Sequence, residues 1–336
     1  MLKWVIRFWI IGILGALVLV LLPGLAAFGA AEQSPARDSF DPSPVMLVPA
    51  SSRSFQLTGS PVYTVYLPIV IGPPAPSPKK GFVEFGAPAC NDLTALRAAW
   101  YQNGGPFPDS SCGSQYHQNF VPRIYNKDGM PYLAQAVANA QASGWLMGFG
   151  EPNLTEQNSY LTPTEGAQLW QQIEDAVAGT EIKLVSPAPN QWNPGQNGQQ
   201  YGHQWTWVMA AEFQRLYGRK PRFDALGWHY YANSLVDLQA FLTARRNEAL
   251  ARGYDVPFWL LEYGGSCVGG STPQLQAFMN AATPWLNQTA WIGRYSWFAA
   301  RLTPWSDSAG HDYTPCSLID YRTGAITALG QTYWWY

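Results

Sequence analysis

Two glutamates each close an apolar run of the kind that forms a buried strand. Glu151 follows "WLMGFG" and Glu262 follows "PFWLL". Two facing carboxylates about 5–5.5 Å apart can hydrolyse a glycosidic bond with retention, because one protonates the leaving oxygen while the other attacks the anomeric carbon. The residues predict Glu151 as the general acid/base and Glu262 as the nucleophile. The alternative for either glutamate alone is a structural role, in which it caps a loop or binds an arginine.

The stretch "MGFGEPN" at residues 147–153 also has the Gly-x-Gly spacing of a phosphate-binding loop. A dinucleotide fingerprint needs a third glycine where Asn153 stands, and it opens a helix directly. The next helix cap is at Thr162, which is several residues too late. The pattern therefore favours a strand end that presents Glu151 over a nucleotide site.

The elements that would position these glutamates alternate between strands and helices. Short apolar runs predict eight strands, at residues 81–85, 98–102, 120–125, 145–150, 182–188, 224–231, 257–264 and 291–299. Thr162 and Glu165 form a capping-box pattern, and Gly218 and Gly253 stand where helices are expected to end. This alternation predicts the α/β class, with a (β/α)8 TIM barrel as a single catalytic domain.

Active sites of such barrels lie where the loops that follow the strands gather. Glu151 ends the fourth predicted strand and Glu262 ends the seventh. These strands lie on opposite sides of the barrel mouth, so both carboxylates can face one bond between them. The joint placement favours catalysis over the structural alternative.

Residues near the predicted strand ends are candidates for binding a sugar. Tyr230 and Tyr295 are candidates to hydrogen-bond the nucleophile, with core packing as the alternative for each, and His229 is expected to be buried. The candidates for stacking on sugar rings, again with core packing as the alternative, are Trp100, Tyr101, Trp192, Trp228, Tyr263, Trp297 and Trp305.

Composition narrows the function classes. Charged residues make up 12% of the chain, about half of the ~25% typical of soluble proteins, while aromatic residues reach 15%. The formal net charge of -2 provides no basic footprint for nucleic acid. The chain has no His-Glu-x-x-His motif and no P-loop, and Val268 replaces the last glycine of a nucleophile elbow. We expect a polysaccharide as the partner, with no cofactor and no metal.

The N-terminal residues indicate export. Lys3 and Arg7 precede an uncharged apolar run over residues 8–31, and Gly29 and Ala31 offer small residues for cleavage. Residues 1–31 are predicted to be a signal peptide, with an uncleaved signal anchor as the alternative. Residues 32–80 are rich in Pro and Ser and form a predicted spacer, and 81–336 form the catalytic domain. We expect a secreted or cell-surface monomer that meets the membrane only through this N-terminal segment.

The four cysteines form an even set in a chain expected to be exported, which favours two disulfides over a metal site. Three connectivities are open. The preferred pairs are Cys90–Cys112 and Cys267–Cys316, because each would close a loop between neighbouring elements.

The stretches "GFGEPN", "KLVSPA", "WHYY", "WLLEYG" and "RYSWFAA" resemble, in this order and spacing, glycoside hydrolase family 128, which has a glycosyl hydrolase catalytic core. The resemblance covers about residues 81–336. It implies a clan A-like retaining barrel, an endo-β-1,3-glucanase with a β-glucan substrate, Glu151 as acid/base and Glu262 as nucleophile. The alternatives are a related glycosidase that acts on another polysaccharide and a carbohydrate-binding pseudoenzyme on the cell surface.

The chain departs from the resembling family at Gly150. The family usually has asparagine before the acid/base glutamate, where its side chain is expected to hydrogen-bond the 2-hydroxyl of the sugar. Asn153 and Asn190 are candidates to replace it, and Asn153 is predicted to bind substrate. The sequence leaves open what takes the place of the missing asparagine.

Overall fold

The computed structural model describes residues 72–85, 88–155, 159–191, 202–304 and 311–336. The predicted signal segment, most of the predicted spacer, Trp192 and Trp305 lie outside the described residues. Among the described residues, no helix is both long enough and apolar enough to cross a membrane.

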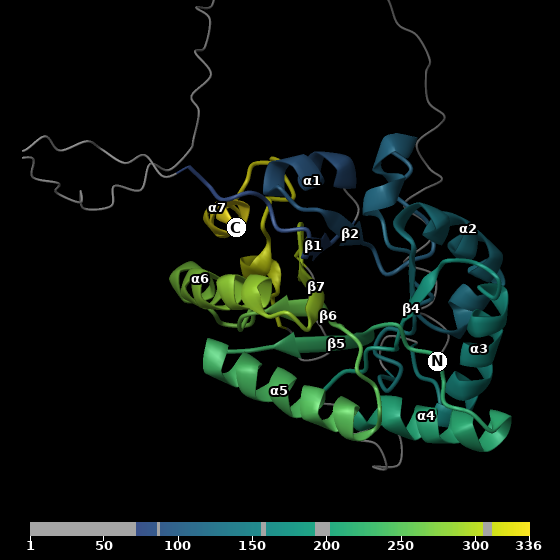
Figure 1. Ribbon diagram of the computed structural model, residues 1–336. Coiled ribbons are helices and arrows are strands. Elements are labelled where there is room, and N and C mark those ends of the chain that lie inside the picture. Colours follow the sequence, from purple (N-terminus) through teal and green to yellow (C-terminus); the bar gives the residue numbers. More distant parts are fainter. Residues whose placement is uncertain (1–71, 86–87, 156–158, 192–201, 305–310) are drawn as a thin grey trace, which may run out of the picture. The chain divides into compact units, whose positions relative to one another are not determined.

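Parallel strands form the centre of the fold (Figure 1). The described residues contain the strands β1 (Lys80–Val83), β2 (Trp100–Gln102), β3 (Trp145–Met147), β4 (Lys183–Val185), β5 (Leu226–Tyr231), β6 (Phe258–Gly264) and β7 (Ile292–Trp297). Five of them pair in the order β2-β1-β7-β6-β5, and β3 pairs with β4. Every pairing between these strands is parallel, as a (β/α)8 barrel requires.

The third predicted strand, at residues 120–125, is wrong in extent. Residues 120–124, called here the bridging segment, make one parallel bridge at Phe120 to Tyr101 of β2 and one at Arg123 to Met147 of β3. Pro122 has no backbone N–H to donate, which interrupts a regular ladder. A further bridge joins Val185 of β4 to Ala225, directly before β5. The parallel ring therefore closes, and the predicted barrel is confirmed.

Helices surround the strands in Figure 1. Their bounds are α1 (Ala89–Leu96), α2 (Leu133–Ser143), α3 (Pro163–Ala176), α4 (Gln204–Tyr217), α5 (Leu235–Ala251), α6 (Thr272–Gln288) and α7 (Ala328–Trp335), with short 3-10 turns at Ser114–Asn119, Lys127–Tyr132 and Thr314–Cys316. The capping box at Thr162 and Glu165 is present, and Gly218 ends α4 in the left-handed conformation. Both predictions are confirmed.

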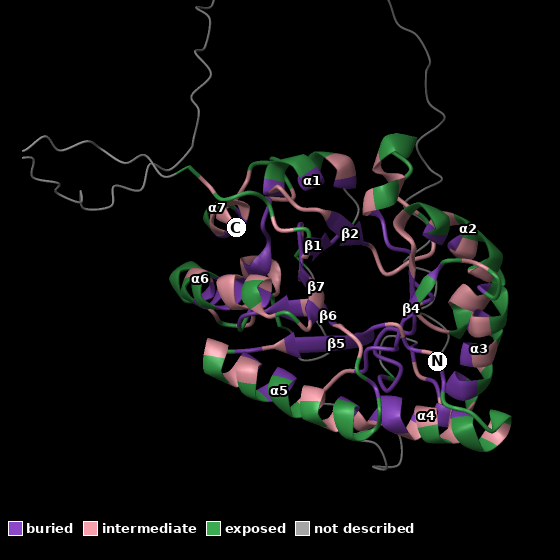
Figure 2. Ribbon diagram, in the orientation of Figure 1, coloured by how far each residue is buried: buried purple, intermediate pink, exposed green. Residues whose placement is uncertain are grey.

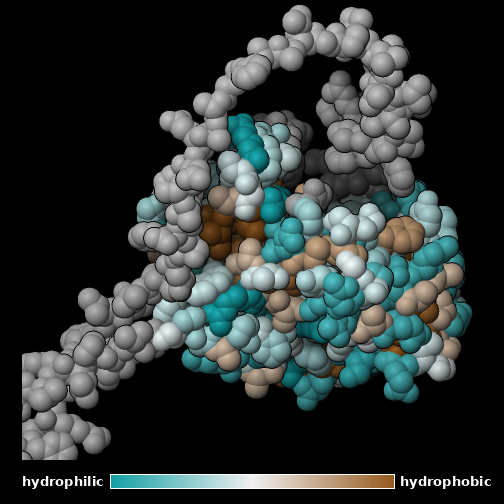
Figure 3. Space-filling model, turned by 90° about the horizontal axis from the view of Figure 1, so that it is seen from above, coloured by the Kyte–Doolittle hydropathy of each residue, from teal (hydrophilic) through white to brown (hydrophobic). Residues whose placement is uncertain are grey.

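Two apolar clusters hold the barrel together. On β6 the residues alternate between them: Trp259 and Leu261 belong to a small cluster with Met147 and Val185, while Phe258 and Leu260 belong to a much larger one. Alternate residues of a strand point to opposite faces, so the small cluster fills the barrel interior and the large cluster lies between barrel and helices. Figure 2 shows buried strands and helices with exposed outer faces. The surface seen in Figure 3 is largely hydrophilic, with scattered hydrophobic residues and one small hydrophobic patch.

Both predicted disulfides are present. Cys90, at the start of α1, pairs with Cys112 at a Cα–Cα distance of 5.6 Å. Cys267, in the loop after β6, pairs with Cys316 at 5.3 Å. The second disulfide ties the loop after the strand of Glu262 to the chain beyond β7.

Residues before the predicted domain boundary at 81 contact the barrel. The backbone carbonyl of Lys79 accepts a hydrogen bond from Tyr295 N at 2.9 Å. The ammonium group of Lys79 donates to Thr289 O at 2.8 Å, and that of Lys80 donates to Tyr333 O at 3.0 Å. The packed unit therefore includes residues upstream of 81 and spans Gly72–Tyr336.

Candidate active site

Glu151 and Glu262 reach the same end of the barrel from different backbone positions. Glu151 follows β3, is 6% exposed, and has φ of 43°, a left-handed conformation that non-glycine residues rarely adopt. Its backbone N–H donates to Ala188 O at 2.9 Å, which holds this turn beside the chain after β4. Glu262 lies inside β6, where a register shift between Leu260 and Tyr263 interrupts the pairing with β7. Each glutamate thus projects from a position where the regular backbone geometry of the barrel wall is interrupted.

His229 lies between the two carboxylates. Its Nδ1 is 3.0 Å from Glu151 Oε1 and 3.4 Å from Glu262 Oε2. One oxygen of each carboxylate and a His229 nitrogen all lie within 4.8 Å of one another. The structure therefore brings the two predicted catalytic side chains together, at an oxygen separation that suits attack on one anomeric carbon from one side and protonation from the other.

Arg123 supplies positive charge beneath the pair. The side chain is buried, and its Nη1 is 3.8 Å from Glu262 Oε1. Its Nε donates to Gly148 O at 3.1 Å, and Nη1 donates to Gln102 Oε1 at 3.3 Å. Arg123 is thereby fixed by neighbouring strands. The sequence signal that was missed is an arginine within an otherwise apolar run, because a buried arginine needs several acceptors.

Asn190 is the amide that contacts Glu151. Its Nδ2 donates to Glu151 Oε1 at 3.2 Å. Asn153 is fully buried and braces Asn190: its amide donates to Asn190 O and its carbonyl accepts from Asn190 N, both at 2.8 Å. The structure therefore gives Asn153 a supporting position, and Asn190 the position beside the glutamate.

The tyrosine that contacts Glu262 is Tyr231, whose hydroxyl donates to Oε2 at 3.0 Å. The predictions for Tyr230 and Tyr295 are wrong, because their hydroxyls donate to Asp237 Oδ1 and Asn287 Oδ1, each at 2.7 Å. A register shift between Trp228 and His229 interrupts the pairing of β5 with β6. Such bulges change which side chains face the site.

Burial controls protonation in this site. It raises the pKa of Glu151 to about 7, against the opposing effects of the Asn190 hydrogen bond and the Arg123 charge. Burial also raises the pKa of Glu262, and it lowers the pKa of His229 to about 4. His229 is therefore neutral at pH 7, so the groups that stabilise the Glu262 carboxylate there are the Arg123 charge and the Tyr231 hydroxyl.

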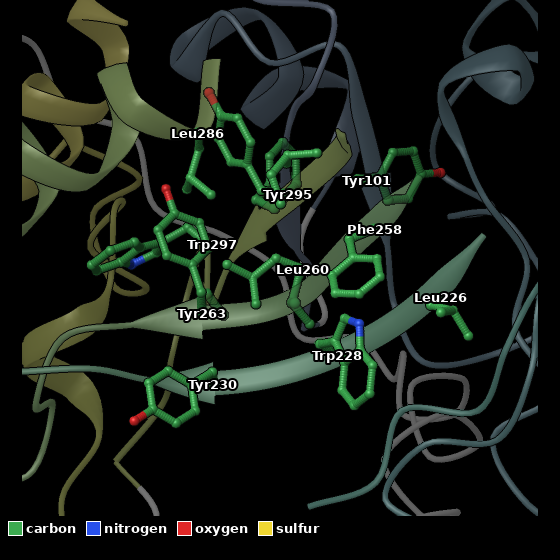
Figure 4. Packing of buried hydrophobic residues seen from close by; sticks show 14 of the residues in the cluster. Tyr101, Leu226, Trp228, Tyr230, Phe258, Leu260, Tyr263, Leu286, Tyr295 and Trp297 are labelled. Atoms are coloured by element: carbon green, nitrogen blue, oxygen red, sulfur yellow. The ribbon is translucent and has the colours of Figure 1, made fainter. Parts of the chain in front are cut away.

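Most predicted stacking residues lie in the core. Figure 4 shows several of their rings packed among aliphatic side chains. Tyr230 stacks on Phe241 with ring centroids 4.0 Å apart, and Trp297 Nε1 donates to Cys316 O at 2.9 Å. The residues that are at most 1% exposed, and for which the prediction of sugar stacking is corrected to core packing, are Trp100, Tyr101, Trp228, Tyr263 and Trp297.

A different set of rings leads from the site to the surface. The Tyr231 ring lies 5.8 Å from Phe298, which lies 5.5 Å from Phe85. Phe85 follows β1 and is 47% exposed. The sequence candidates did not include Phe85 and Phe298, although both lie at the ends of predicted strands, where a sugar-binding ring could have been expected.

The donor set Glu151, His229 and Glu262 is also one that can hold a metal ion. Arg123 lies 3.8 Å from Glu262 and within 3.3 Å of the other ring nitrogen of His229. A fixed guanidinium at that distance repels a divalent cation and neutralises one carboxylate itself. The arrangement fits an acid and a nucleophile better than a metal centre.

Comparison with known proteins agrees with this geometry. The sequence model of the family described as the glycosyl hydrolase catalytic core matches residues 85–333. No curated protein matched the chain. A subgroup II endo-β-1,3-glucanase of glycoside hydrolase family 128 from Pseudomonas viridiflava has 28% sequence identity and a TM-score of 0.61, covering 77% of this chain and 97% of its own.

Two further structures share the fold. A subgroup II endo-β-1,3-glucanase from Sorangium cellulosum has 22% identity and a TM-score of 0.60, covering 76% of this chain and 97% of its own. A subgroup III curdlan-specific exo-β-1,3-glucanase from Blastomyces gilchristii, in complex with glucose, has 21% identity and a TM-score of 0.60, covering 77% of this chain and 99% of its own.

The predicted resemblance to glycoside hydrolase family 128 is thereby confirmed. The family match spans most of the 336 residues, from the end of β1 into α7. It includes both glutamates and the side chains that surround them. The chain belongs to the glycosyl hydrolase catalytic core family and is a glycoside hydrolase.

Proposed function

We propose that the protein is an endo-β-1,3-glucanase that acts by double displacement, with Glu151 as acid/base and Glu262 as nucleophile. The observation that carries the proposal is the approach of the two carboxylates, one oxygen of each lying within 4.8 Å of the other. This spacing supports retention, because an inverting pair stands about 6.5–9.5 Å apart to admit a water molecule. The similarity to family 128 β-1,3-glucanases supports the substrate.

In the first step, the Glu262 carboxylate attacks the anomeric carbon while Glu151 donates its proton to the leaving oxygen. This yields a glycosyl ester on Glu262 and frees the leaving sugar. In the second step, Glu151 takes a proton from water, which displaces Glu262 from the anomeric carbon. The raised pKa of Glu151, about 7, keeps a proton available for the first step near neutral pH.

Each neighbour has a part in these steps. Arg123 and Tyr231 favour the charged form of Glu262 that attacks. Asn190 orients Glu151 through its amide, and neutral His229 spaces the two carboxylates without adding charge. Phe298 and exposed Phe85 provide rings on which sugars can stack on the way to the surface.

The purified protein should be incubated with laminarin, curdlan, cellulose, xylan and mannan, and the reducing ends should be measured. Release from laminarin and curdlan is expected, and chromatography should show oligosaccharides of mixed length rather than glucose alone. Glucose as the sole early product would indicate exo action. Cleavage of xylan or mannan without cleavage of β-1,3-glucan would overturn the substrate.

The mechanism has its own test. Proton NMR of the first products should show the β anomer, the configuration of the substrate. Glu262→Gln should lose at least about 1,000-fold in kcat, since it removes the nucleophile. An α-anomeric first product would contradict double displacement. Tight binding of laminarin oligosaccharides by the wild-type chain without turnover would instead identify a carbohydrate-binding pseudoenzyme.

We also propose that the protein is exported by its N-terminal segment. Lys3 and Arg7 before the apolar run at residues 8–31 support this. Expression of the full chain in a secreting host, followed by N-terminal sequencing of the extracellular product, should give a new terminus near Glu32. A full-length product that stays with the membrane fraction would support the anchor, and one left in the cytosol would contradict export.

A further inference from the structure

Gly150 precedes Glu151 where the resembling family usually has asparagine, and its backbone does not explain the glycine. The φ of Gly150 does not lie in the left-handed region, unlike that of Glu151 beside it. Any residue can adopt such a backbone conformation. The reason for glycine must therefore lie in the space that a side chain would occupy.

That space is filled by the ring of Tyr125. A Cβ placed on Gly150 would lie 2.2 Å from Tyr125 Cε2 and 2.4 Å from Cδ2, and 3.0 Å from Arg123 Cζ. Carbon atoms do not approach so closely without a shift of one of them. Tyr125 follows the bridging segment directly, and this segment borders β3 on the edge that does not pair with β4. Gly150 and the ring of Tyr125 thus fit together, and a larger residue at position 150 would displace the ring.

The ring is held in this position. The carbonyl of Tyr125 accepts a hydrogen bond from Gly150 N at 2.8 Å, which fixes the two backbones side by side. The guanidinium of Arg123 lies over the ring, 5.4 Å from its centroid.

The phenol of Tyr125 is under the influence of both glutamates. Burial raises the pKa of Tyr125, and the negative charges of Glu151 and Glu262 raise it further. The phenol therefore keeps its proton across the working range of the enzyme. A neutral hydroxyl can donate to, or accept from, a hydroxyl of a bound sugar.

We propose that Tyr125 replaces the missing asparagine: its hydroxyl contacts the 2-hydroxyl of the glucose ring held between Glu151 and Glu262. The inference rests on the proposed function, and it adds the residue that binds this part of the substrate. Tyr125 is then a residue that determines specificity. Of the candidates from the sequence, Asn190 contacts Glu151 and Asn153 braces Asn190.

The test compares Tyr125→Phe with the wild type on two substrates: an aryl β-laminaribioside, and its analogue without the 2-hydroxyl on the ring at the cleaved bond. Loss of one hydrogen bond that strengthens in the transition state should lower kcat/KM on the first substrate by about 10- to 100-fold. On the 2-deoxy analogue the change should be less than about threefold, because its bond is already absent. Equal losses on both substrates, or no loss on either, would overturn the proposal. Thermal denaturation checks that both proteins fold alike.

A double variant distinguishes a contact between Tyr125 and the substrate from simple filling of space by its ring. Tyr125→Ala should lose activity, and Tyr125→Ala combined with Gly150→Asn should regain part of it, because the ring no longer fills the space that asparagine needs. Gly150→Asn alone should lower the melting temperature. An unchanged melting temperature for Gly150→Asn would contradict the steric argument, and a double variant no better than Tyr125→Ala would contradict the replacement.

Failure of the proposed function is distinguishable from failure of this inference. A wild-type protein that cleaves neither substrate contradicts the proposed function. In that case, calorimetric binding of laminaritriose to the wild type and to Tyr125→Phe still decides the role. Binding weakened by about tenfold supports the contact, as expected for one lost hydrogen bond, and equal affinity overturns it.

Discussion

At the scale of residues, the two catalytic candidates have identical side chains but different neighbours, and the neighbours determine which charge state each one favours. Glu262 lies against Arg123 and Tyr231, which favour its charged form, whereas the direct hydrogen-bonding neighbours of Glu151 are an amide and a neutral imidazole. Acid and nucleophile are commonly set apart in this way. Glu262 and Glu151 differ in this way because their partners come from different parts of the barrel wall: Arg123 from the bridging segment, Tyr231 from β5 and Asn190 from the chain after β4.

The pH dependence of activity should report Glu151. Its pKa is raised to about 7, so its protonated form is the acid below that pH and is lost as the pH rises through it. We expect kcat/KM on laminarin to fall by about tenfold per pH unit above this value. The measurement is a pH profile from pH 4 to 9.

Glu151→Ala provides the control. With an aryl substrate whose leaving group needs no protonation, the variant should keep its first step and lose the alkaline limb of the profile. An alkaline limb that persists unchanged in Glu151→Ala would assign it to another group.

At the scale of elements, the two disulfides close loops of different length. Cys90 and Cys112 are 22 residues apart, and Cys267 and Cys316 are 49 apart. Chain-entropy arguments assign about 3 kcal/mol to the shorter loop and about 4 kcal/mol to the longer one. We expect Cys267→Ser/Cys316→Ser to destabilise the fold slightly more than Cys90→Ser/Cys112→Ser, as measured by denaturant unfolding. A reversed order would show that native contacts outweigh loop length.

Glu84, directly after β1, gives the fold a dependence on pH. It is 2% exposed, and its neighbour Asp92 is bound in two-pronged fashion by Arg301. Burial, and then the charge of Asp92, raise the pKa of Glu84 above its ordinary value of 4.5. The folded state therefore holds a proton that the unfolded chain releases, so stability present below pH 4.5 is lost as the pH rises, by at most about 1.4 kcal/mol per pH unit.

Glu84→Gln copies the protonated form and should flatten this decline in the free energy of unfolding. The exposed residue Glu181 offers a matched control, since Glu181→Gln should leave the slope of the wild type. If Glu84→Gln kept the full slope, another buried group would be responsible.

Features that depend on nearby residues in the chain could be predicted from the sequence, whereas features that depend on the pairing of distant strands could not. The cap at Thr162 and the end of α4 at Gly218 depend on neighbours in the chain, and both were predictable. The bridging segment and the bulge before His229 depend on how adjacent strands pair, so the run at 120–125 and the choice of Tyr230 over Tyr231 were wrong. Arg123 was missed because its partners come from other strands.

At the scale of the whole molecule, the catalytic unit extends upstream of the boundary predicted from composition. Lys79 and Lys80 bind carbonyl groups at Thr289 and Tyr333, far along the chain. A chain of residues 72–336 should therefore keep the melting temperature and the activity of the longer protein. A chain that begins at residue 81 should melt several degrees lower, since the loss of about 1 kcal/mol shifts the midpoint of a domain of this size by about 2–4 °C. Equal melting temperatures for the two truncated chains would show that these lysines contribute nothing.

The barrel wall is not equally regular all the way round. Its bridging segment is joined to β2 and β3 by single bridges, and Pro122 donates no hydrogen bond. The amides on either side of Pro122 nevertheless donate backbone hydrogen bonds, Val121 to Tyr101 O and Arg123 to Gly105 O. Native-state hydrogen exchange should therefore find these amides protected. The bridging segment also carries Arg123 and leads into Tyr125. On slow heating, catalysis and helix content should therefore be lost together, because this segment is bonded to both of its neighbours.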